Sequence, residues 1–215
     1  MLDITNFGLF AISVFLLSVT PGPDMAYVMG QSVANGRRAG ILSASGVALG
    51  SCTHAIASTL GLTALITASP VMFTAIKYIG ASYLLFLGGK MLLGTFVGKK
   101  DRGDAAPQNT SRKVSAYRLL SRGFITTLTN PKVLLFFVSF FPQFVTPEGE
   151  QHAASFLLLG VTYAFIAFLV DVTFAILAGS TAGVVAGNQK LQILLDRIVG
   201  ATFIALGIRL VLTRR

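Results

Sequence analysis

The sequence predicts an all-α integral membrane protein with six transmembrane helices, arranged as two inverted three-helix repeats. Composition is the first observation: of 215 residues, 53% are hydrophobic and 12% charged, and the mean hydropathy is +0.75, which is typical of membrane proteins. Length is the second observation, because a helix needs about 20 apolar residues to cross the hydrocarbon core. Six spans then use nearly the whole chain, and we expect one domain, residues 1–215, in a lipid bilayer.

Three apolar runs form the first predicted repeat, residues 1–97. They cover residues 7–33, 39–68 and 71–97. The first run is interrupted by Thr-Pro-Gly-Pro-Asp at 20–24, and the second contains no charged residue. Turn residues and prolines between the runs predict the helix boundaries.

Residues 98–118 differ sharply in composition from the runs on either side. Basic residues are mixed there with Pro, Gly, Asn and Ser, which predicts a basic cytoplasmic linker. The second repeat, residues 119–215, contains the other three apolar runs. They cover residues 119–145, 153–186 and 191–212, and the fourth run is broken at Asn130-Pro131.

The positions of the basic residues predict the orientation and argue against a nucleic-acid partner. The net charge of +9 comes from Lys and Arg residues that cluster between apolar runs instead of covering a soluble surface. With six spans and an outside N-terminus, most of them fall on inward connections, while the acidic turn at 147–150 faces outward. We therefore expect both termini outside, although the basic C-terminal end runs against this count.

The two halves also resemble each other. Gly80–Tyr83 is echoed by Gly200–Phe203, each followed by a Leu-Gly pair, and the first and fourth runs both break at a proline. Three helices per half place the second half upside down in the membrane, as in many secondary transporters. Gly, Ala and Leu are common in membrane helices, so the echo alone has a simpler explanation. The paired proline breaks favour the repeat.

The proline breaks are where polar chemistry is expected inside the membrane. An unpaired backbone group in hydrocarbon costs several kcal/mol, so a break needs packed protein or a water-filled cavity around it. Pro21 and Pro23 remove two backbone donors, and Gly22 between them permits close approach of a ligand. A helix restarting near Asp24 would present free amides and the positive end of its dipole, which suits a carboxylate.

Ionisable residues within the apolar runs mark the candidate site. Asp24, Lys132 and Asp171 each cost about 3 kcal/mol at a helix centre, and such residues usually face a cavity. The alternatives are that Asp24 is an ordinary helix N-cap and that Lys132 is a structural partner of one of these aspartates. His54 is either a packing residue or a participant in proton transfer.

These arguments give two predicted sets of site residues. The substrate-binding set contains Pro21, Gly22, Pro23, Asp24, Asn130, Pro131 and Lys132. The proton-coupling set contains Asp24, Asp171 and His54.

No cofactor or metal is expected, and an enzyme is disfavoured. Cys52 is the only cysteine, and phosphate-loop, HExxH and GxSxG motifs are absent from the sequence. An intramembrane enzyme using Asp24, Asp171 and His54 as acid and base would need a substrate-activating group that the sequence does not contain. A membrane-embedded binding or assembly protein would not need ionisable residues beside paired helix breaks. A second copy of the chain, in a homodimer, is a candidate partner, but the sequence does not give the oligomeric state.

Five motifs, in this order and spacing, resemble those of the LysE/RhtB family of amino-acid exporters. They are 18–24 (SVTPGPD), 36–40 (GRRAG), 78–84 (YIGASYL), 123–132 (from GF to TNPK) and 140–144 (FFPQF). The resemblance covers essentially the whole chain. It implies a carrier in a bacterial cytoplasmic membrane that exports amino acids or derivatives such as threonine, homoserine or lysine, driven by a proton or other ion gradient. Neutral substrates are favoured over lysine.

The residues themselves suggest how such a substrate would bind. We expect its carboxylate to meet the helix amides after Pro23 or the ammonium of Lys132. Asp24 or Asp171 would receive its amino group, and a proton arriving from outside at one carboxylate would then reset the carrier.

Overall fold

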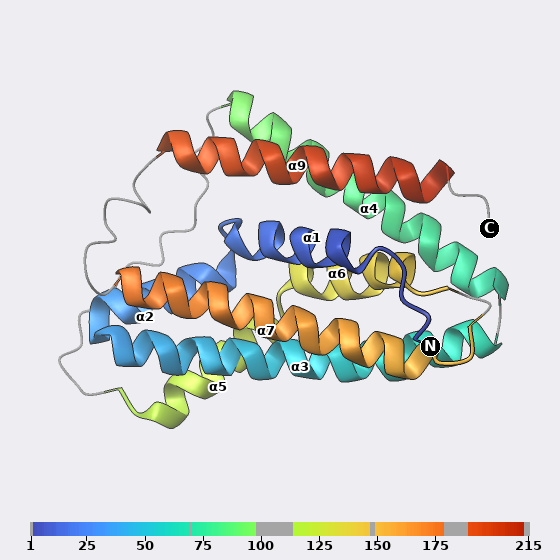
Figure 1. The fold of residues 1–215 in the computed structure, drawn as a ribbon. Coiled ribbons are helices and arrows are strands. Elements are labelled where there is room, and N and C mark those ends of the chain that lie inside the picture. The colour runs from blue at the N-terminus through green and yellow to red at the C-terminus, as the bar shows by residue number, and fades with distance from the viewer. Residues whose placement is uncertain (1, 69, 98–113, 147–148, 179–188, 213–215) are drawn as a thin grey trace.

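The computed structural model is helical throughout its described parts, apart from one isolated bridge between Ile4 and Val145. The structure describes residues 2–68, 70–97, 114–146, 149–178 and 189–212. Figure 1 shows these helices as an elongated bundle. In chain order they are α1 (Phe7–Val19), α2 (Pro23–Asn35), α3 (Arg37–Ala68), α4 (Pro70–Val97), α5 (Ala116–Leu128), α6 (Pro131–Phe140), the 3-10 helix η1 (Phe141–Phe144), α7 (His152–Ala178) and α9 (Gln189–Leu212).

Two to four candidate membrane spans are present in the described residues. By length and composition, α3 over Arg37–Ala64 and α7 are each sufficient to cross a membrane. Two further spans are bent pairs: α1 with α2 at 53°, and α5 with the segment Pro131–Phe144 at 54°. The all-helical fold is as expected, and two to four of the six predicted spans meet this criterion.

The structure has a helix break at both predicted positions, near the middle of each bent helix pair. Helix α1 ends because Thr20 takes an extended conformation and Pro21 has no amide hydrogen to continue the helix. Helix α2 begins with Pro23 at its first position, where a proline is favoured. Since α1 and α2 have 13 residues each, about 20 Å of helix lies on either side of the break.

The second break has the same plan. Helix α5 has 13 residues and ends before Asn130, and α6 restarts with Pro131 at its first position. Helix α5 begins at Ala116, so the last three residues of the predicted linker 98–118 are helical. Residues 98–113 of that linker lie outside the described parts.

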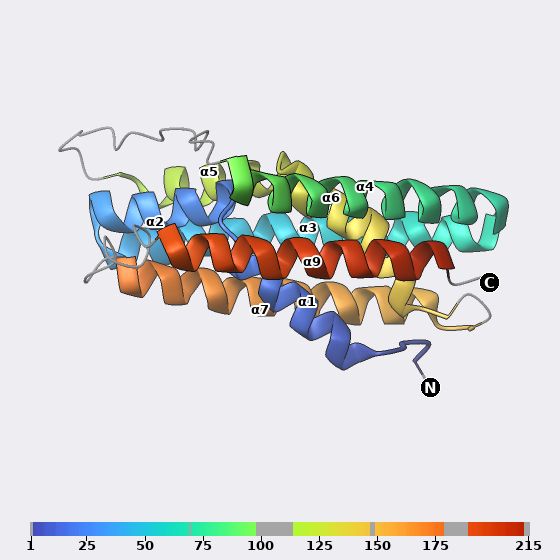
Figure 2. The same cartoon turned by 90° about the horizontal axis from the view of Figure 1, so that it is seen from above.

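The long helices pack as antiparallel pairs through small residues. Helix α3 packs on α7, with Gly160 of α7 against Ala55 of α3, and α4 packs on α9, with Gly88 against the carbonyl of Gly200 (Figures 1 and 2). A Cβ on Gly88 would lie 2.6 Å from that carbonyl oxygen, so the two backbones approach as closely as glycine allows.

An aromatic core joins α1, α6, η1 and α7. Its members are buried and share ring contacts: Phe10, Phe136, Phe137, Phe140, Phe141, Phe144 and Tyr163. This core fixes the second half of the α5–α6 span against α1 and α7, and so it holds the two breaks in register.

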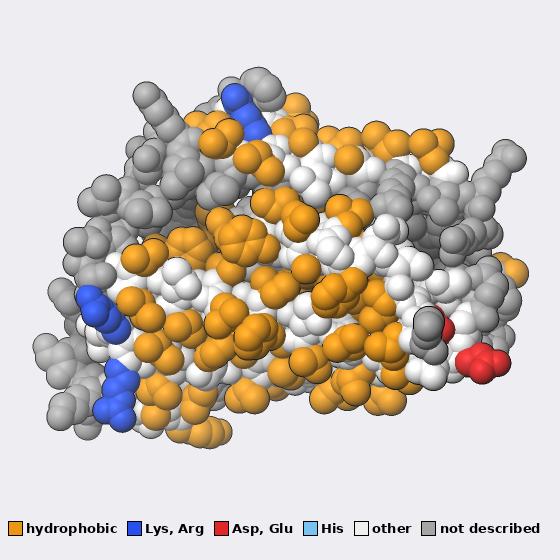
Figure 3. All heavy atoms as spheres, in the orientation of Figure 1, with side chains coloured by type: hydrophobic (Ala, Val, Ile, Leu, Met, Phe, Trp, Pro, Cys, Tyr) orange, Lys and Arg blue, Asp and Glu red, His pale blue; other side chains and the backbone are white. Residues whose placement is uncertain are grey.

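The surface separates into an apolar body and two charged ends. Large exposed apolar side chains, including Phe15, Leu60, Phe86 and Phe165, cover the middle, and Figure 3 shows one such face. The exposed basic side chains in the described residues lie at or toward one end: Arg37, Arg38, Lys90, Arg118, Arg122 and Arg197. Asp3 and Glu150 lie at the other end, where α9 finishes and the N-terminal segment begins (Figures 1 and 3).

Candidate functional site

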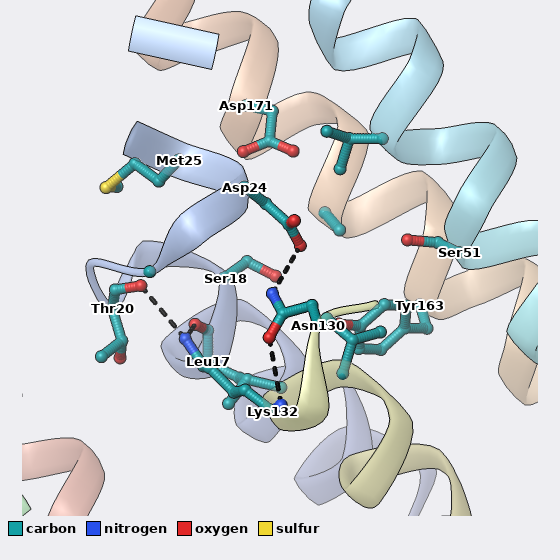
Figure 4. Close-up of a pocket in the computed structure, with 14 residues that line it drawn as sticks. Leu17, Ser18, Thr20, Asp24, Met25, Ser51, Asn130, Lys132, Tyr163 and Asp171 are labelled. Carbon is teal, nitrogen blue, oxygen red and sulfur yellow. Dashed lines mark hydrogen bonds between the residues drawn. The ribbon is translucent and has the colours of Figure 1, made fainter. Parts of the chain in front are cut away.

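A small polar cavity lies where the two breaks meet (Figure 4). Its volume is about 40 Å³ for the centres of water molecules, which is room for roughly three waters. Residues from α1, α2, α3, α6 and α7 and from both breaks line it: Leu17, Ser18, Thr20, Gly22, Asp24, Met25, Val47, Ser51, Asn130, Lys132, Val133, Tyr163, Ala167 and Asp171.

Lys132 repairs the backbone at the first break. In a continuous helix the carbonyl of Leu17 would accept a hydrogen bond from residue 21, but Pro21 has no amide hydrogen. The Lys132 ammonium donates to the Leu17 carbonyl oxygen at 2.9 Å and to that of Thr20 at 3.1 Å. Its positive charge therefore sits at the negative end of the α1 dipole. The Leu17 oxygen also accepts from the Thr20 amide at 3.2 Å, so Lys132 is a second donor there.

His54 plays the corresponding part at the second break. The carbonyl of Thr127 has no donor at residue 131, which is proline, and accepts instead from the Asn130 amide at 3.0 Å. The Nε2 atom of His54 lies 3.1 Å from the same oxygen. A carbonyl can only accept, so Nε2 carries the hydrogen in this contact. The imidazole is buried in α3 and stacks on Phe137, with ring centroids 5.7 Å apart. His54 does not line the cavity.

Asn130 connects the two breaks directly. Its side-chain oxygen accepts a hydrogen bond from the Lys132 amide at 3.0 Å and so caps α6. Its side-chain NH₂ donates to Asp24 Oδ2, also at 3.0 Å. One buried amide side chain therefore fixes the start of α6 and holds the Asp24 carboxylate from the other half of the chain.

Two carboxylates face the same cavity with few partners. Asp24 Oδ1 is buried without a hydrogen-bond partner, and α2 has Gly22 as its N-cap with no side-chain cap, so the N-cap alternative for Asp24 does not hold. Asp171 on α7 is only 5% exposed, and no hydrogen bond or ion pair to it is found within the described parts of the chain. In Figure 4 both carboxylates lie on the side of the cavity opposite the Lys132 ammonium. Buried charges of this kind need a cation, a proton or a ligand.

The structure gathers most of the predicted site residues. Gly22, Asp24, Asn130, Lys132 and Asp171 line the cavity together. The three prolines of the predicted set, Pro21, Pro23 and Pro131, shape the breaks without lining it.

Sequence reasoning missed four polar lining residues. They are Ser18, Thr20, Ser51 and Tyr163. Ser18 and Thr20 adjoin the first break and could have been included by proximity. Tyr163, Ala167 and Asp171 recur every fourth residue along α7, so they share one helix face, and this spacing was the available signal. Ser51 carried no comparable signal.

Comparisons with known proteins agree over nearly the full length. Residues 15–214 match the family model for LysE type translocators. A leucine efflux protein of Enterobacter sp. (strain 638) is 33% identical over 210 residues, covering 96% of this chain and 95% of the relative. A leucine efflux protein of Klebsiella pneumoniae is 32% identical over 208 residues, with coverage of 96% and 95%. An uncharacterised membrane protein of Pseudomonas aeruginosa is 34% identical over 210 residues, with coverage of 97% and 96%. No solved structure matches.

Proposed function

The chain belongs to the LysE type translocator family, whose members are transporters and not enzymes, and we propose that it exports neutral amino acids such as leucine from the bacterial cytoplasm. Relatives named leucine efflux protein support this substrate class. The apolar part of the cavity lining supports it too, because Leu17, Met25, Val47 and Val133 suit an aliphatic side chain.

The meeting of two helix breaks at a charged cavity is the observation that carries the proposal. The α2 end of the first break has no side-chain cap and offers the positive end of a helix dipole to a carboxylate. Asp24 and Asp171 offer negative charge to an amino group in the same space. A zwitterion is the ligand that such a pairing suits, whereas an assembly protein would gain nothing from it.

The cavity volume supports a closed state of an alternating-access carrier. Space for roughly three water molecules is too small for an amino acid with an aliphatic side chain. The bent spans would therefore have to move apart before a substrate enters. Bends of 53° and 54° at the breaks provide natural hinges for that movement.

The helix pairing supports six spans in two inverted three-helix repeats. An axis in the membrane plane would relate α3 to α7 and α4 to α9 and would make each pair antiparallel, as they are. The sequence echo falls at the α4–α9 contact, where Gly88 meets Gly200 and Gly207 meets Ala81. Contacts of this reciprocal kind are typical of two-fold interfaces.

Charge placement supports the orientation with both termini outside. The basic end of the bundle would face the cytoplasm, because exposed Lys and Arg residues favour that side. The N-terminal segment and the end of α9 lie at the opposite end, beside Asp3 and Glu150.

Proton coupling follows from the charge of the cavity. With Asp24, Asp171 and Lys132 ionised, two negative charges and one positive charge leave a net charge of −1. One proton, or one other monovalent cation, would neutralise the buried site and remove the cost of an uncompensated charge. Protons entering from outside would then drive amino acids out.

Counterflow in proteoliposomes tests the proposal. We expect the purified protein to exchange labelled L-leucine, and we expect acid on the opposite side to accelerate leucine movement toward that side. Asp171→Asn should keep exchange but lose the acceleration, while Glu150→Gln, at the outer end, should keep both. A wild-type protein that exchanges none of the neutral amino acids would overturn the proposed function. Acceleration that persists in Asp171→Asn would remove Asp171 from coupling.

A further inference from the structure

We propose that the Leu17 and Thr20 carbonyl oxygens form the subsite for the substrate's ammonium group, and that Lys132 occupies this subsite as a tethered cation in the empty carrier. The inference rests on the proposed function and refines it. It replaces two simpler expectations: that Lys132 binds the substrate's carboxylate, and that Asp24 or Asp171 contacts the substrate's amino group directly.

The chemistry of the contact supports this assignment. The side-chain amine of Lys132 is a primary ammonium with three donors, the same group that an α-amino acid carries. It donates to the Leu17 and Thr20 oxygens at 2.9 and 3.1 Å, and both of these residues line the cavity. Pro21 cannot supply the usual helical hydrogen bond, so the Leu17 oxygen accepts from the Thr20 amide at 3.2 Å and has a second lone pair that Lys132 fills. A substrate ammonium is an equivalent donor in the same place.

The cavity also offers Lys132 a second position. Asp24 Oδ1 and the Asp171 carboxylate lie in the same lining and take part in no hydrogen bond or ion pair among the residues described. A lysine side chain has four flexible carbons, so its ammonium can turn from one set of oxygens to the other. Gly22 leaves room beside it, because a Cβ there would lie 3.6 Å from Lys132 Nζ.

This exchange would couple substrate release to proton entry. When the substrate ammonium takes the α1 carbonyls, Lys132 pairs with the carboxylates and neutralises one of them. When a proton arrives at the carboxylates, Lys132 loses that partner and returns to Leu17 and Thr20. The returning ammonium displaces the substrate. Proton and substrate then bind in alternation, which is the requirement for antiport.

Binding measurements on purified variants test this inference. The probes are L-leucine, 3-methylbutylamine, which lacks the carboxylate, and 4-methylpentanoate, which lacks the amino group. In Lys132→Gln the competing charge is removed while an amide donor remains. We expect leucine and the amine to bind on the order of tenfold tighter than to the wild-type protein. The Lys132 ammonium competes for the same carbonyls there, and a competitor lowers the apparent affinity in proportion to its occupancy of the site. Leucine counterflow should fall in Lys132→Gln. The control Lys90→Met, which removes an exposed lysine, should change neither the binding of the probes nor counterflow.

Two results would overturn the inference without touching the proposed function. The first is loss of leucine and 4-methylpentanoate binding in Lys132→Gln with unchanged amine binding, because Lys132 would then contact the carboxylate. The second is unchanged binding of all three probes beside normal wild-type counterflow. If Lys132→Gln fails to fold, the same probes are measured on Lys132→Met, which also removes the charge, and the same outcomes apply to that protein.

Discussion

The two helix breaks share one backbone defect and correct it with different chemistry. In each, the carbonyl four residues before a proline lacks its usual donor and accepts instead from the amide three residues on, and a side chain from the other half of the molecule supplies a second donor. At the first break the donor is the Lys132 ammonium, which is charged, flexible and part of the cavity lining. At the second it is the His54 imidazole, which is buried, stacked on Phe137 and outside that lining.

This difference separates structural support from substrate binding in two breaks that are built alike. A buried, stacked imidazole donor holds the second break in one geometry. A mobile charged donor leaves the first break able to exchange partners with a ligand. The residue that follows the proline also differs between the breaks. It is Gly22 in the first break and Lys132 in the second. We infer that the first break is the one that binds and that the second holds the groups aimed at it.

Removing the donor of the first break should have the largest effect on transport. Lys132→Met keeps most of the side-chain volume but removes the charge and both hydrogen bonds to α1. We expect leucine counterflow to fall by more than tenfold, because the substrate ammonium then has no competitor to drive its release. The measurement is initial counterflow rate per folded carrier, with Lys90→Met as the control. Wild-type counterflow rates in Lys132→Met would contradict the functional difference between the two breaks.

Removing the donor of the second break should affect stability more than transport chemistry. His54→Leu removes the side-chain donor of the Thr127 oxygen but leaves its bond from the Asn130 amide, and we expect a loss of about 0.5–1.5 kcal/mol in the free energy of unfolding. Pro131→Ala restores an amide donor, so the same substitution in that background should cost clearly less. Thermal or denaturant unfolding of the four proteins in this double-mutant cycle measures the difference.

A companion variant decides whether His54 transfers protons. His54→Gln keeps a donor for Thr127 but cannot titrate near neutral pH. We expect leucine counterflow with an unchanged pH profile. A shifted profile would return His54 to the coupling residues.

Removing the Asn130 side chain, which connects the two breaks, should have an intermediate effect on stability and on leucine binding. Asn130→Ala removes the N-cap of α6 and the partner of Asp24 Oδ2. We expect a loss of about 1–2 kcal/mol in unfolding free energy from the cap, and weaker leucine binding because Asp24 is no longer held in place. Thr129→Ala, an exposed neighbour, is the matched control. Equal effects of the two substitutions would argue against the bridge.

The smallest effect is expected from adding one methyl group to the first break, at Gly22. Gly22 has an extended backbone that alanine can adopt, and an added Cβ would lie 3.6 Å from Lys132 Nζ, an ordinary contact distance. We expect Gly22→Ala to change unfolding free energy by less than about 0.5 kcal/mol and counterflow by less than about twofold. A larger loss of counterflow would show that the path of Lys132 is tighter than its resting contacts indicate.

The sequence predicted the breaks because proline acts locally, within four residues of its own position. Pro21, Pro23 and Pro131 identified where helices end, and charges within apolar runs identified Asp24, Lys132 and Asp171. The structure places these side chains around one cavity, as expected from the cost of isolating them in lipid.

The partners of the repairing side chains could not be predicted in the same way. Lys132 and Leu17 are 115 residues apart, and His54 and Thr127 are 73 apart, so only the packed bundle brings them together. A single lysine in an apolar run looks the same whether it meets a carboxylate or a carbonyl. Charge therefore favours a pairing with aspartate, and the contacts of Lys132 with the Leu17 and Thr20 carbonyls have no signal in the sequence.

Cysteine protection tests most directly whether this cavity is where the amino acid binds. Ser18 lines the cavity, so Ser18→Cys is introduced after Cys52, the only natural cysteine, is replaced by serine. The rate of modification by a small cationic thiol reagent is measured with and without L-leucine, with Glu150→Cys at the outer end as the control. We predict that leucine slows modification of Ser18→Cys several-fold and leaves Glu150→Cys unchanged. A carrier that exchanges leucine while the Ser18→Cys rate stays the same would place the substrate elsewhere and contradict the account.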